Sequence, residues 1–232
     1  MNLKILLYKT VKLISRSVLD IFYPRECIAC NSFVNIGNKL SVCRCCKNTL
    51  NARSVVIRNS EKYFDEAICS FEYSGNIKKA MSDFKFKRLT YLAQTFAYAV
   101  YDNVKNRDFL HSVSFICPVP LHPMRDRDYN QSELIAKELS HYINVKMIPD
   151  ILIKTKNLPP LSKMDYPKRN YMIKSSFALN PGHDVSGKTI CLVDDIYTTS
   201  ATVNECARVL KMHGAKAVYV LCPCYTKKRK EK

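Results

Sequence analysis

The most constraining stretch of the sequence is a short apolar run that ends in two adjacent carboxylates. Residues 190–193 are Ile-Cys-Leu-Val, and they follow a turn residue, Gly187. A run this short is typical of a strand, and apolar residues on both faces favour a central strand of a parallel sheet that is covered by helices. Asp194 and Asp195 come next, and a helical pattern begins at Thr202. The alternative is a buried strand that ends in two acids by chance.

The residues between this acid pair and the helix are small or carry hydroxyl groups. In an open α/β sheet, ligands bind beyond the carboxyl ends of the strands. A turn of small residues before a helix presents backbone N–H groups and the positive end of the helix dipole to an anion. We therefore expect Asp194 and Asp195 to hold a ribose diol and Mg²⁺. We expect a 5′-phosphate to bind the loop formed by Thr198, Thr199, Ser200, Ala201 and Thr202.

A second constraint is a group of cysteines near the start of the chain. Cys27 and Cys30 form one C-x₂-C pair, and Cys43 and Cys46 form another. Four thiolates at this spacing predict a closed tetrahedral Zn²⁺ site, which is structural because no coordination position stays open. Cys45 is then a spare or an alternate ligand. The alternative is a set of buried cysteines without a metal.

The remaining composition indicates a reduced, basic protein. The other six of the 11 cysteines lie in apolar runs, where a free thiol behaves as a small hydrophobe, and reduced thiols indicate the cytoplasm. With 37 basic and 20 acidic residues the net charge is +17, which favours a polyanionic partner or phosphorylated ligands. Many lysines are scattered along the chain, so a general richness in lysine is the alternative.

The first residues predict an amphipathic helix. Residues 3–22 place apolar side chains at steps of three and four, with lysines on the other face, and Pro24 ends the pattern. Basic residues interrupt the apolar run, so neither a signal peptide nor a membrane span is predicted. We favour a helix that docks on the neighbouring module over one that lies on a membrane surface, although peripheral proximity to a membrane stays open.

Two loops carry further candidate phosphate ligands. Residues 115–118 predict a strand that leads into a proline-rich loop, where Arg125 and Arg127 can bind phosphate oxygens bidentately before a helix over 131–142. Residues 154–176 form a long polar segment with Arg169 and Asn170, typical of a functional loop or of disorder.

An aromatic and basic run, Phe-Lys-Phe-Lys-Arg, ends the helix predicted from residue 76. Aromatic residues interleaved with basic ones can stack on bases and pair with phosphates. Phe84 also continues the apolar stripe of this helix, so we favour packing in the core. Another helix is predicted over 90–105.

Strands and helices alternate along the rest of the chain. Strands are predicted over 67–71, 147–153 and 217–222, in addition to those at 115–118 and 190–193. The economical architecture is an α/β fold, a mainly parallel sheet flanked by helices with a small N-terminal module built on four cysteines. The predicted domains are residues 1–60 for the helix and zinc-ribbon module, 61–226 for the α/β domain and 227–232 for a basic tail.

The run Asp-Asp-Ile-Tyr-Thr-Thr-Ser-Ala-Thr at 194–202 closely resembles the phosphoribosyl-pyrophosphate (PRPP) signature of type I phosphoribosyltransferases. The family usually has Gly where this chain has Ser200, and Gly eases a tight turn close to phosphate. Ser200 can still fit if its φ is negative. The resemblance implies a type I phosphoribosyltransferase-like fold in which Asp194 and Asp195 are catalytic.

Several motifs together closely resemble the ComF family, whose core is like that of the amidophosphoribosyltransferases. They are the cysteine pairs, Phe-Lys-Phe-Lys, the run Pro-Val-Pro-Leu-His-Pro at 118–123, Arg169-Asn170 and the PRPP loop. The resemblance implies natural competence: PRPP binding and work beside an uptake helicase and strand-handling factors on single-stranded DNA in the cytoplasm. It also implies that His122, Arg125 and Arg127 hold pyrophosphate, and that Arg169 and Asn170 belong to a flexible loop over the site.

Two functional hypotheses follow. In the first, the protein is an active phosphoribosyltransferase that transfers phosphoribosyl from PRPP to an acceptor, by positioning and electrostatics. In the second, the pocket is a sensor or a relic in a DNA-binding competence factor. We favour PRPP binding within a DNA-uptake protein and leave turnover open.

Overall fold

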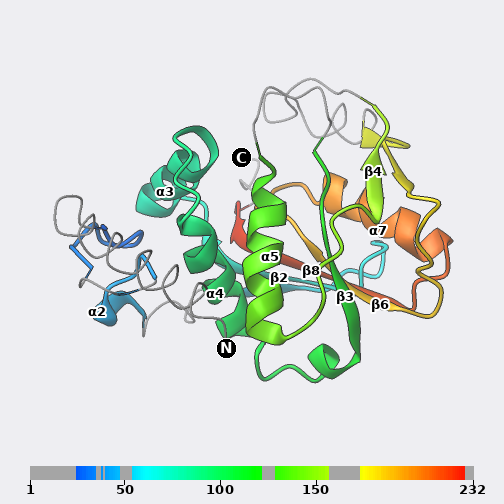
Figure 1. Ribbon diagram of the computed structural model, residues 1–232, viewed down its shortest axis with the longest axis horizontal. Helices are drawn as coiled ribbons and strands as arrows, with labels where there is room; N and C mark the ends of the chain where they lie inside the picture. Colours follow the sequence, from blue (N-terminus) through cyan, green and yellow to red (C-terminus); the bar gives the residue numbers. More distant parts are fainter. Residues whose placement is uncertain are drawn as a thin grey trace, which may run out of the picture.

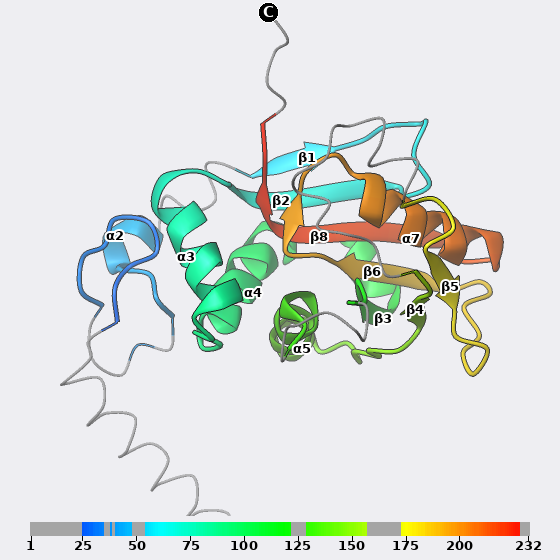
Figure 2. The same ribbon diagram turned by 90° about the horizontal axis from the view of Figure 1, so that it is seen from above.

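The computed structural model describes residues 25–34, 38, 40–47, 54–121, 129–156 and 173–227. Figures 1 and 2 show a twisted sheet with helices on both sides and a small cysteine-bearing module at one end. The helices are α2 (Arg44–Lys47), α3 (Gly75–Phe86), α4 (Leu92–Val104), η2 (Asp108–Ser112), α5 (Gln131–Ile143) and α7 (Ala201–Met212). The strands are β1 (Val55–Ile57), β2 (Glu66–Glu72), β3 (Val113–Pro118), β4 (Leu152–Lys154), β5 (Phe177–Leu179), β6 (Thr189–Val193), β7 (Ile196–Tyr197) and β8 (Ala217–Tyr225).

The main sheet of the described residues has the order β1-β2-β8-β6-β3, with β7 paired to the end of β8. All pairings are parallel except that of β1 with β2. β6 lies inside this sheet, and all five of its residues are buried, as the uninterrupted apolar run predicts. The predicted fold class, a mainly parallel sheet flanked by helices, is confirmed.

Each face of the sheet has its own core. On one face, α3, α4 and α5 pack around Phe84, Phe96 and Ile116. On the other face, α7 and the small β4–β5 sheet pack around Ile190 and Leu192. Parallel strands need cover on both faces because each of their faces is apolar, and these two clusters provide it.

The cysteine module, defined here as residues 25–34, 38 and 40–47, packs against the first of these cores. Its Cys27, Ile28, Val34 and Val42 are buried in the same cluster as Phe84. Figure 2 places the module beside α3, away from the sheet.

Polar and cation–π contacts add to this apolar junction. Asn76, in the first turn of α3, donates to the Ala29 carbonyl at 3.0 Å, and the Ser41 N–H donates to Thr95 of α4 at 2.8 Å. The Arg25 guanidinium lies 5.0 Å from the Tyr91 ring centroid. The module and the α/β domain therefore share one apolar core.

Most predicted elements are present with similar bounds, and one is wrong. A strand was expected over 147–153, but Met147 makes only an isolated parallel bridge to Ile116. The strand that forms is β4, from Leu152, and it pairs with β5 in a separate antiparallel sheet. An apolar run cannot show where a chain leaves one sheet for another, because both environments bury it.

The six cysteines outside the cysteine module are all free and buried, as their apolar surroundings predict. They are Cys69, Cys117, Cys191, Cys206, Cys222 and Cys224. Among the described residues, no helix has the length and apolar character to cross a membrane. The predicted helix over 3–22 and most of the basic tail lie outside the described residues.

Candidate functional site

The acid pair lies directly beyond β6, at the carboxyl edge of the sheet. The Asp194 N–H donates to the Leu221 carbonyl of β8 at 3.2 Å, which fixes the backbone where the chain leaves the strand. The Asp194 carboxylate accepts from the Asp195 N–H at 2.9 Å and from the Ser132 hydroxyl at 3.1 Å. Ser132 is in the first turn of α5, so the site joins a strand end and a helix start.

The position of Ser132 is set by a capping residue. The Asn130 side chain caps α5 by accepting from the Ser132 N–H at 3.0 Å, and it donates to the Val119 carbonyl at 2.9 Å. The Val119 N–H in turn donates to the Val193 carbonyl at 2.8 Å. The start of the loop after β3 is thereby held next to the end of β6, on the edge where Asp194 lies.

A lysine from a third element reaches the other carboxylate. Lys85 Nζ, on the last turn of α3, lies 2.7 Å from Asp195 Oδ2, and both side chains are largely enclosed. Sequence reasoning missed this residue: it treated the Phe-Lys-Phe-Lys run as packing or as a nucleic-acid contact. No local pattern signals this contact, because it joins α3 to the end of β6, and these elements are far apart along the chain.

The environment of Asp194 favours its neutral form. Burial, followed by the charge of Asp195, raises the pKa of Asp194 to about 7, and the Asp195 N–H, Lys85 and Ser132 partly oppose this rise. The negative charge of Asp195 makes ionisation of Asp194 less favourable, in the same direction as burial. The Asp194 carboxyl group therefore gains or loses its proton close to neutral pH, and a cation or a hydrogen-bonding ligand would compete with that proton.

The predicted phosphate loop connects β7 to α7. β7 pairs with the end of β8, and the Thr226 N–H donates to the Tyr197 carbonyl at 2.9 Å, so the loop starts from a fixed backbone. Thr198, Thr199 and Thr202 are partly exposed, whereas Ser200 and Ala201 are buried. The sequence therefore brings the acid pair and the hydroxyl-bearing loop to the same edge of the sheet.

Ser200 does not have the negative φ with which serine would fit this turn. Its φ is 63° and its ψ is −5°, in the left-handed region. A non-glycine residue in this region costs on the order of 1 kcal/mol, and such strain persists where the surrounding structure enforces it. The turn thus keeps the backbone that glycine would adopt although serine occupies the position.

The other predicted ligands lie outside the described residues. These are His122, Arg125 and Arg127 of the loop after β3, and Arg169 and Asn170 of the segment before β5. Their assignments remain predictions.

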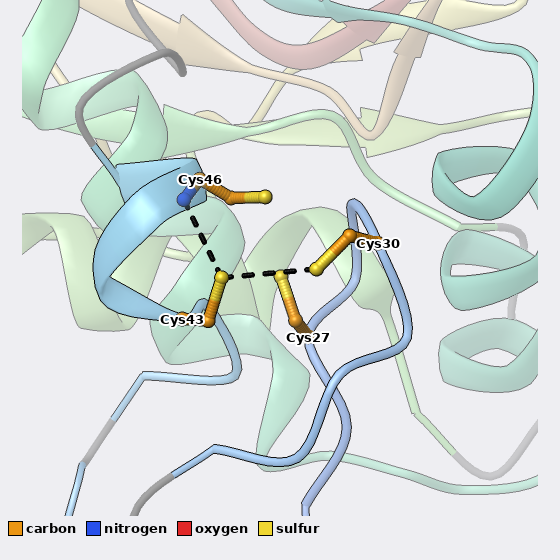
Figure 3. A group of neighbouring side chains, drawn as sticks. All are labelled: Cys27, Cys30, Cys43 and Cys46. Carbon is orange, nitrogen blue, oxygen red and sulfur yellow. Dashed lines mark hydrogen bonds between the residues drawn. The ribbon is translucent and has the colours of Figure 1, made fainter.

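The four paired cysteines form a candidate metal centre. Figure 3 shows Cys27 and Cys30 from one loop facing Cys43 and Cys46, which lie at α2. Their four Sγ atoms all lie within 4.8 Å of one another, and Cys30 Sγ and Cys43 Sγ are 3.7 Å apart. Tetrahedral Zn²⁺ with Zn–S bonds of about 2.3 Å requires sulfur–sulfur distances of about 3.8 Å, so the cluster could hold such an ion.

The four thiols differ in how far their surroundings favour the thiolate that a metal binds, and burial raises the pKa of Cys46. Hydrogen bonding to Ser32 lowers the pKa of Cys30 to about 6, whereas burial raises the pKa of Cys27. The Cys46 N–H donates to Cys43 Sγ at 3.4 Å, a bond that stabilises a thiolate. Cys45 is exposed and is not one of the four clustered residues.

No protein-family model matches this chain, but curated proteins named for competence and for DNA utilization are similar to it. Competence protein F of Haemophilus influenzae is 25% identical over 166 residues, which cover 69% of this chain and 72% of that protein. DNA utilization protein YhgH of Escherichia coli is 33% identical over 113 residues, which cover 48% of this chain and 49% of that protein. The matched segment thus spans about half of the latter protein. These relatives support assigning the chain to the ComF family.

Several solved phosphoribosyltransferase structures have a similar arrangement. One is a hypoxanthine phosphoribosyltransferase from Staphylococcus aureus, with a TM-score of 0.41 and 10% identity, covering 60% of this chain and 66% of that one. This score is too low for the likeness to indicate a ligand or an activity.

Proposed function

We propose that the carboxyl edge of this sheet binds PRPP together with Mg²⁺, in a protein that acts in DNA uptake. One observation carries the proposal. Asp194 and Asp195 directly follow a central parallel strand, and a turn rich in hydroxyl groups connects this part of the chain to the N-terminus of α7. The ribose diol needs hydrogen-bond acceptors, and the 5′-phosphate of the same sugar needs anion-binding groups close by. The acid pair and the turn offer both at the same edge of the sheet.

The two carboxylates also suit Mg²⁺. This ion binds carboxylate oxygens and substrate phosphates, and it keeps several waters. Asp194 and Asp195 are both partly exposed, so water and a ligand can reach their oxygens. When bound, the ion would neutralise the diphosphate of PRPP. Asp194 and Asp195 would orient it and the ribose, while the loop 198–202 would hold the 5′-phosphate.

The DNA-related role rests on the relatives and on charge. The names of two relatives, Competence protein F and DNA utilization protein YhgH, refer to competence and to the use of DNA. The net charge of +17 suits a chain that works near single-stranded DNA, and 11 cysteines of which none is paired among the described residues suit the reducing cytoplasm. An uptake helicase and strand-handling proteins would then be its neighbours, and the zinc of the cysteine module would be structural.

Turnover is a further candidate. In it, the acid pair and the loop 198–202 would hold the ribose and its phosphate for transfer of the phosphoribosyl group, by positioning and electrostatics.

Thermal melting with PRPP and Mg²⁺ tests the ligand. A ligand present at about 100 times its Kd stabilises the folded state by about 2.7 kcal/mol, which raises Tm by roughly 5–10 °C for a chain of this size. We expect this rise in wild type, and we expect Asp194→Asn/Asp195→Asn to lose it. Asparagine keeps the size of each side chain and removes the charge.

Two controls sharpen the measurement. Glu61→Gln/Asp184→Asn removes two exposed carboxylates elsewhere and should keep the full rise in Tm. Ribose 5-phosphate and pyrophosphate, each added alone, show which half of the ligand the site holds. A wild-type Tm that PRPP and Mg²⁺ leave unchanged would contradict the proposed ligand.

Salt titration tests the DNA role. If the excess of positive charge binds single strands, the logarithm of the affinity should fall linearly with the logarithm of the salt concentration, with a slope of about −0.7 for each phosphate contacted. The measurement is fluorescence anisotropy of a labelled oligonucleotide between low and physiological salt. Binding that does not respond to salt would show that the excess of positive charge is not what holds DNA.

A further inference from the structure

The last turn of α3 holds three consecutive residues in three different environments. Phe84 is fully buried, and its ring lies 5.7 Å from Phe96 and 6.1 Å from Tyr129 between centroids. Tyr129 also donates a hydrogen bond to the Phe84 carbonyl. Phe86 is 68% exposed. Because neighbouring residues on a helix point about 100° apart, Lys85 is directed to the side, toward the carboxyl edge of the sheet.

The ammonium of Lys85 is held in a fixed place by this anchoring. Its side chain is only 14% exposed, and that of Asp195 is 17% exposed. A lysine is rarely enclosed to this extent without a partner, because removing its charge from water is costly. A purely structural ion pair would satisfy the same rule. Here, however, the partner is one of two adjacent carboxylates at the ligand edge, and the pair joins elements that are far apart in sequence.

We propose that Lys85 is the resident counter-cation of the acid pair, and that it exchanges Asp195 for a phosphate oxygen when Mg²⁺ and a phosphorylated sugar bind. This rests on the proposed function and names a residue that contacts the ligand. In the ligand-free protein, Lys85 offsets one of the two negative charges. Asp194 and Asp195 would hold Mg²⁺ when it is bound, and the ammonium of Lys85 would then be free to contact the diphosphate.

The chemistry of lysine suits this exchange. Its ammonium has three donors on a flexible four-carbon stem, so it can turn from a carboxylate to a phosphate without movement of the helix. The backbone of α3 stays fixed because Phe84 and Tyr129 hold the turn. Bonds between ammonium and phosphate oxygens are charge-assisted and are among the stronger hydrogen bonds in proteins.

The binding of two ligands tests the proposed role of Lys85, and its substitution should change the two affinities in opposite directions. Mn²⁺ alone, which takes the same oxygen ligands as Mg²⁺ and is visible by electron paramagnetic resonance, measures competition for the acid pair. We expect Lys85→Met to bind Mn²⁺ several-fold more tightly than wild type, because the resident cation is gone. PRPP with Mg²⁺, followed by calorimetry, should bind Lys85→Met about tenfold or more weakly, as expected for one lost charge-assisted bond.

The control lies on the same helix. Lys79→Met removes the same charge from an exposed position of α3 and should leave both affinities unchanged. Lys85→Gln serves as a second neutral variant if the methionine variant folds poorly, and Lys85→Arg should keep Mn²⁺ affinity near that of wild type. All variants retain the four-cysteine cluster, so any Mn²⁺ it binds is common to them.

The possible failures are distinguishable. If wild type does not bind PRPP, the proposed function is overturned, and with it the phosphate contact of Lys85. If wild type binds PRPP and Lys85→Met binds it equally well, only the Lys85 proposal is overturned. Unchanged Mn²⁺ affinity in Lys85→Met would likewise show that the lysine does not compete for Asp195.

Discussion

Replacing Cys27 with serine should abolish the zinc binding that we expect at the four-cysteine cluster, and it should destabilise the α/β domain as well as the cysteine module. Structural Zn²⁺ contributes about 10–16 kcal/mol of apparent binding free energy in zinc-finger peptides, and this energy is available for folding. Cys27 is fully buried in the core that also contains Phe84 and Phe96. Loss of the metal therefore loosens a cluster on which α3 and α4 depend.

The measurements are zinc content by mass spectrometry and thermal unfolding. We expect about one Zn²⁺ per wild-type chain and little in Cys27→Ser, together with a lower Tm and an earlier loss of the α-helical signal. Treating wild type with a strong chelator should reproduce the effect, because it removes the same ion without a substitution.

Cys45→Ser is the matched control. Cys45 lies between two members of the cluster in sequence but is exposed and not part of it. Its substitution should leave zinc content and Tm close to those of wild type. If Cys27→Ser kept its zinc while Cys45→Ser lost it, the ligand set would have to be redrawn around Cys45.

The second large effect is on the pH dependence of stability. The pKa of Asp194 is raised from 3.8 to about 7 in the folded protein. Below about pH 4 the Asp194 carboxyl group is protonated in both the folded and the unfolded protein, so its ionisation does not change the free energy of unfolding. As pH rises from about 4 to about 7, the unfolded chain releases the proton and the folded chain retains it, so stability falls.

The size of this effect has an upper limit of about 4 kcal/mol, since a tenfold difference in proton affinity between the folded and unfolded states is worth about 1.4 kcal/mol. Asp194 is partly exposed, and solvent screening reduces the observed value below that limit. Asp194→Asn cannot titrate and keeps an acceptor oxygen for Ser132 or for the Asp195 N–H. Its stability relative to wild type should therefore increase as pH rises from 5 to 8.

Urea unfolding at several pH values measures this difference. Glu61→Gln, which removes an exposed carboxyl group, is the control and should follow the wild-type curve. Parallel curves for wild type and Asp194→Asn between pH 5 and 8 would mean that the carboxyl of Asp194 has an ordinary pKa. Its role as the group that keeps a proton at the acid pair would then be wrong.

The sequence by itself determined the inner strand β6 and the position of the acid pair at its carboxyl end. A short apolar run with no polar face is best accommodated as an inner parallel strand, so β6 and the acid pair beyond it followed from residue types alone. The paired spacing of Cys27, Cys30, Cys43 and Cys46 likewise predicted a cluster, because such pairs turn both thiols to one side.

Other features were decided only by the tertiary structure. The contact of Lys85 with Asp195 joins two elements that are far apart along the chain, and no local pattern encodes such a pairing. The left-handed backbone of Ser200 is imposed by the turn between β7 and α7 against the preference of serine. The strand expected over 147–153 formed from Leu152 onward, because the partner strand, and not apolar character, determines where pairing begins. The local sequence thus determined that two carboxylates lie at the carboxyl end of β6. The packing of distant elements determined that Lys85 joins them there.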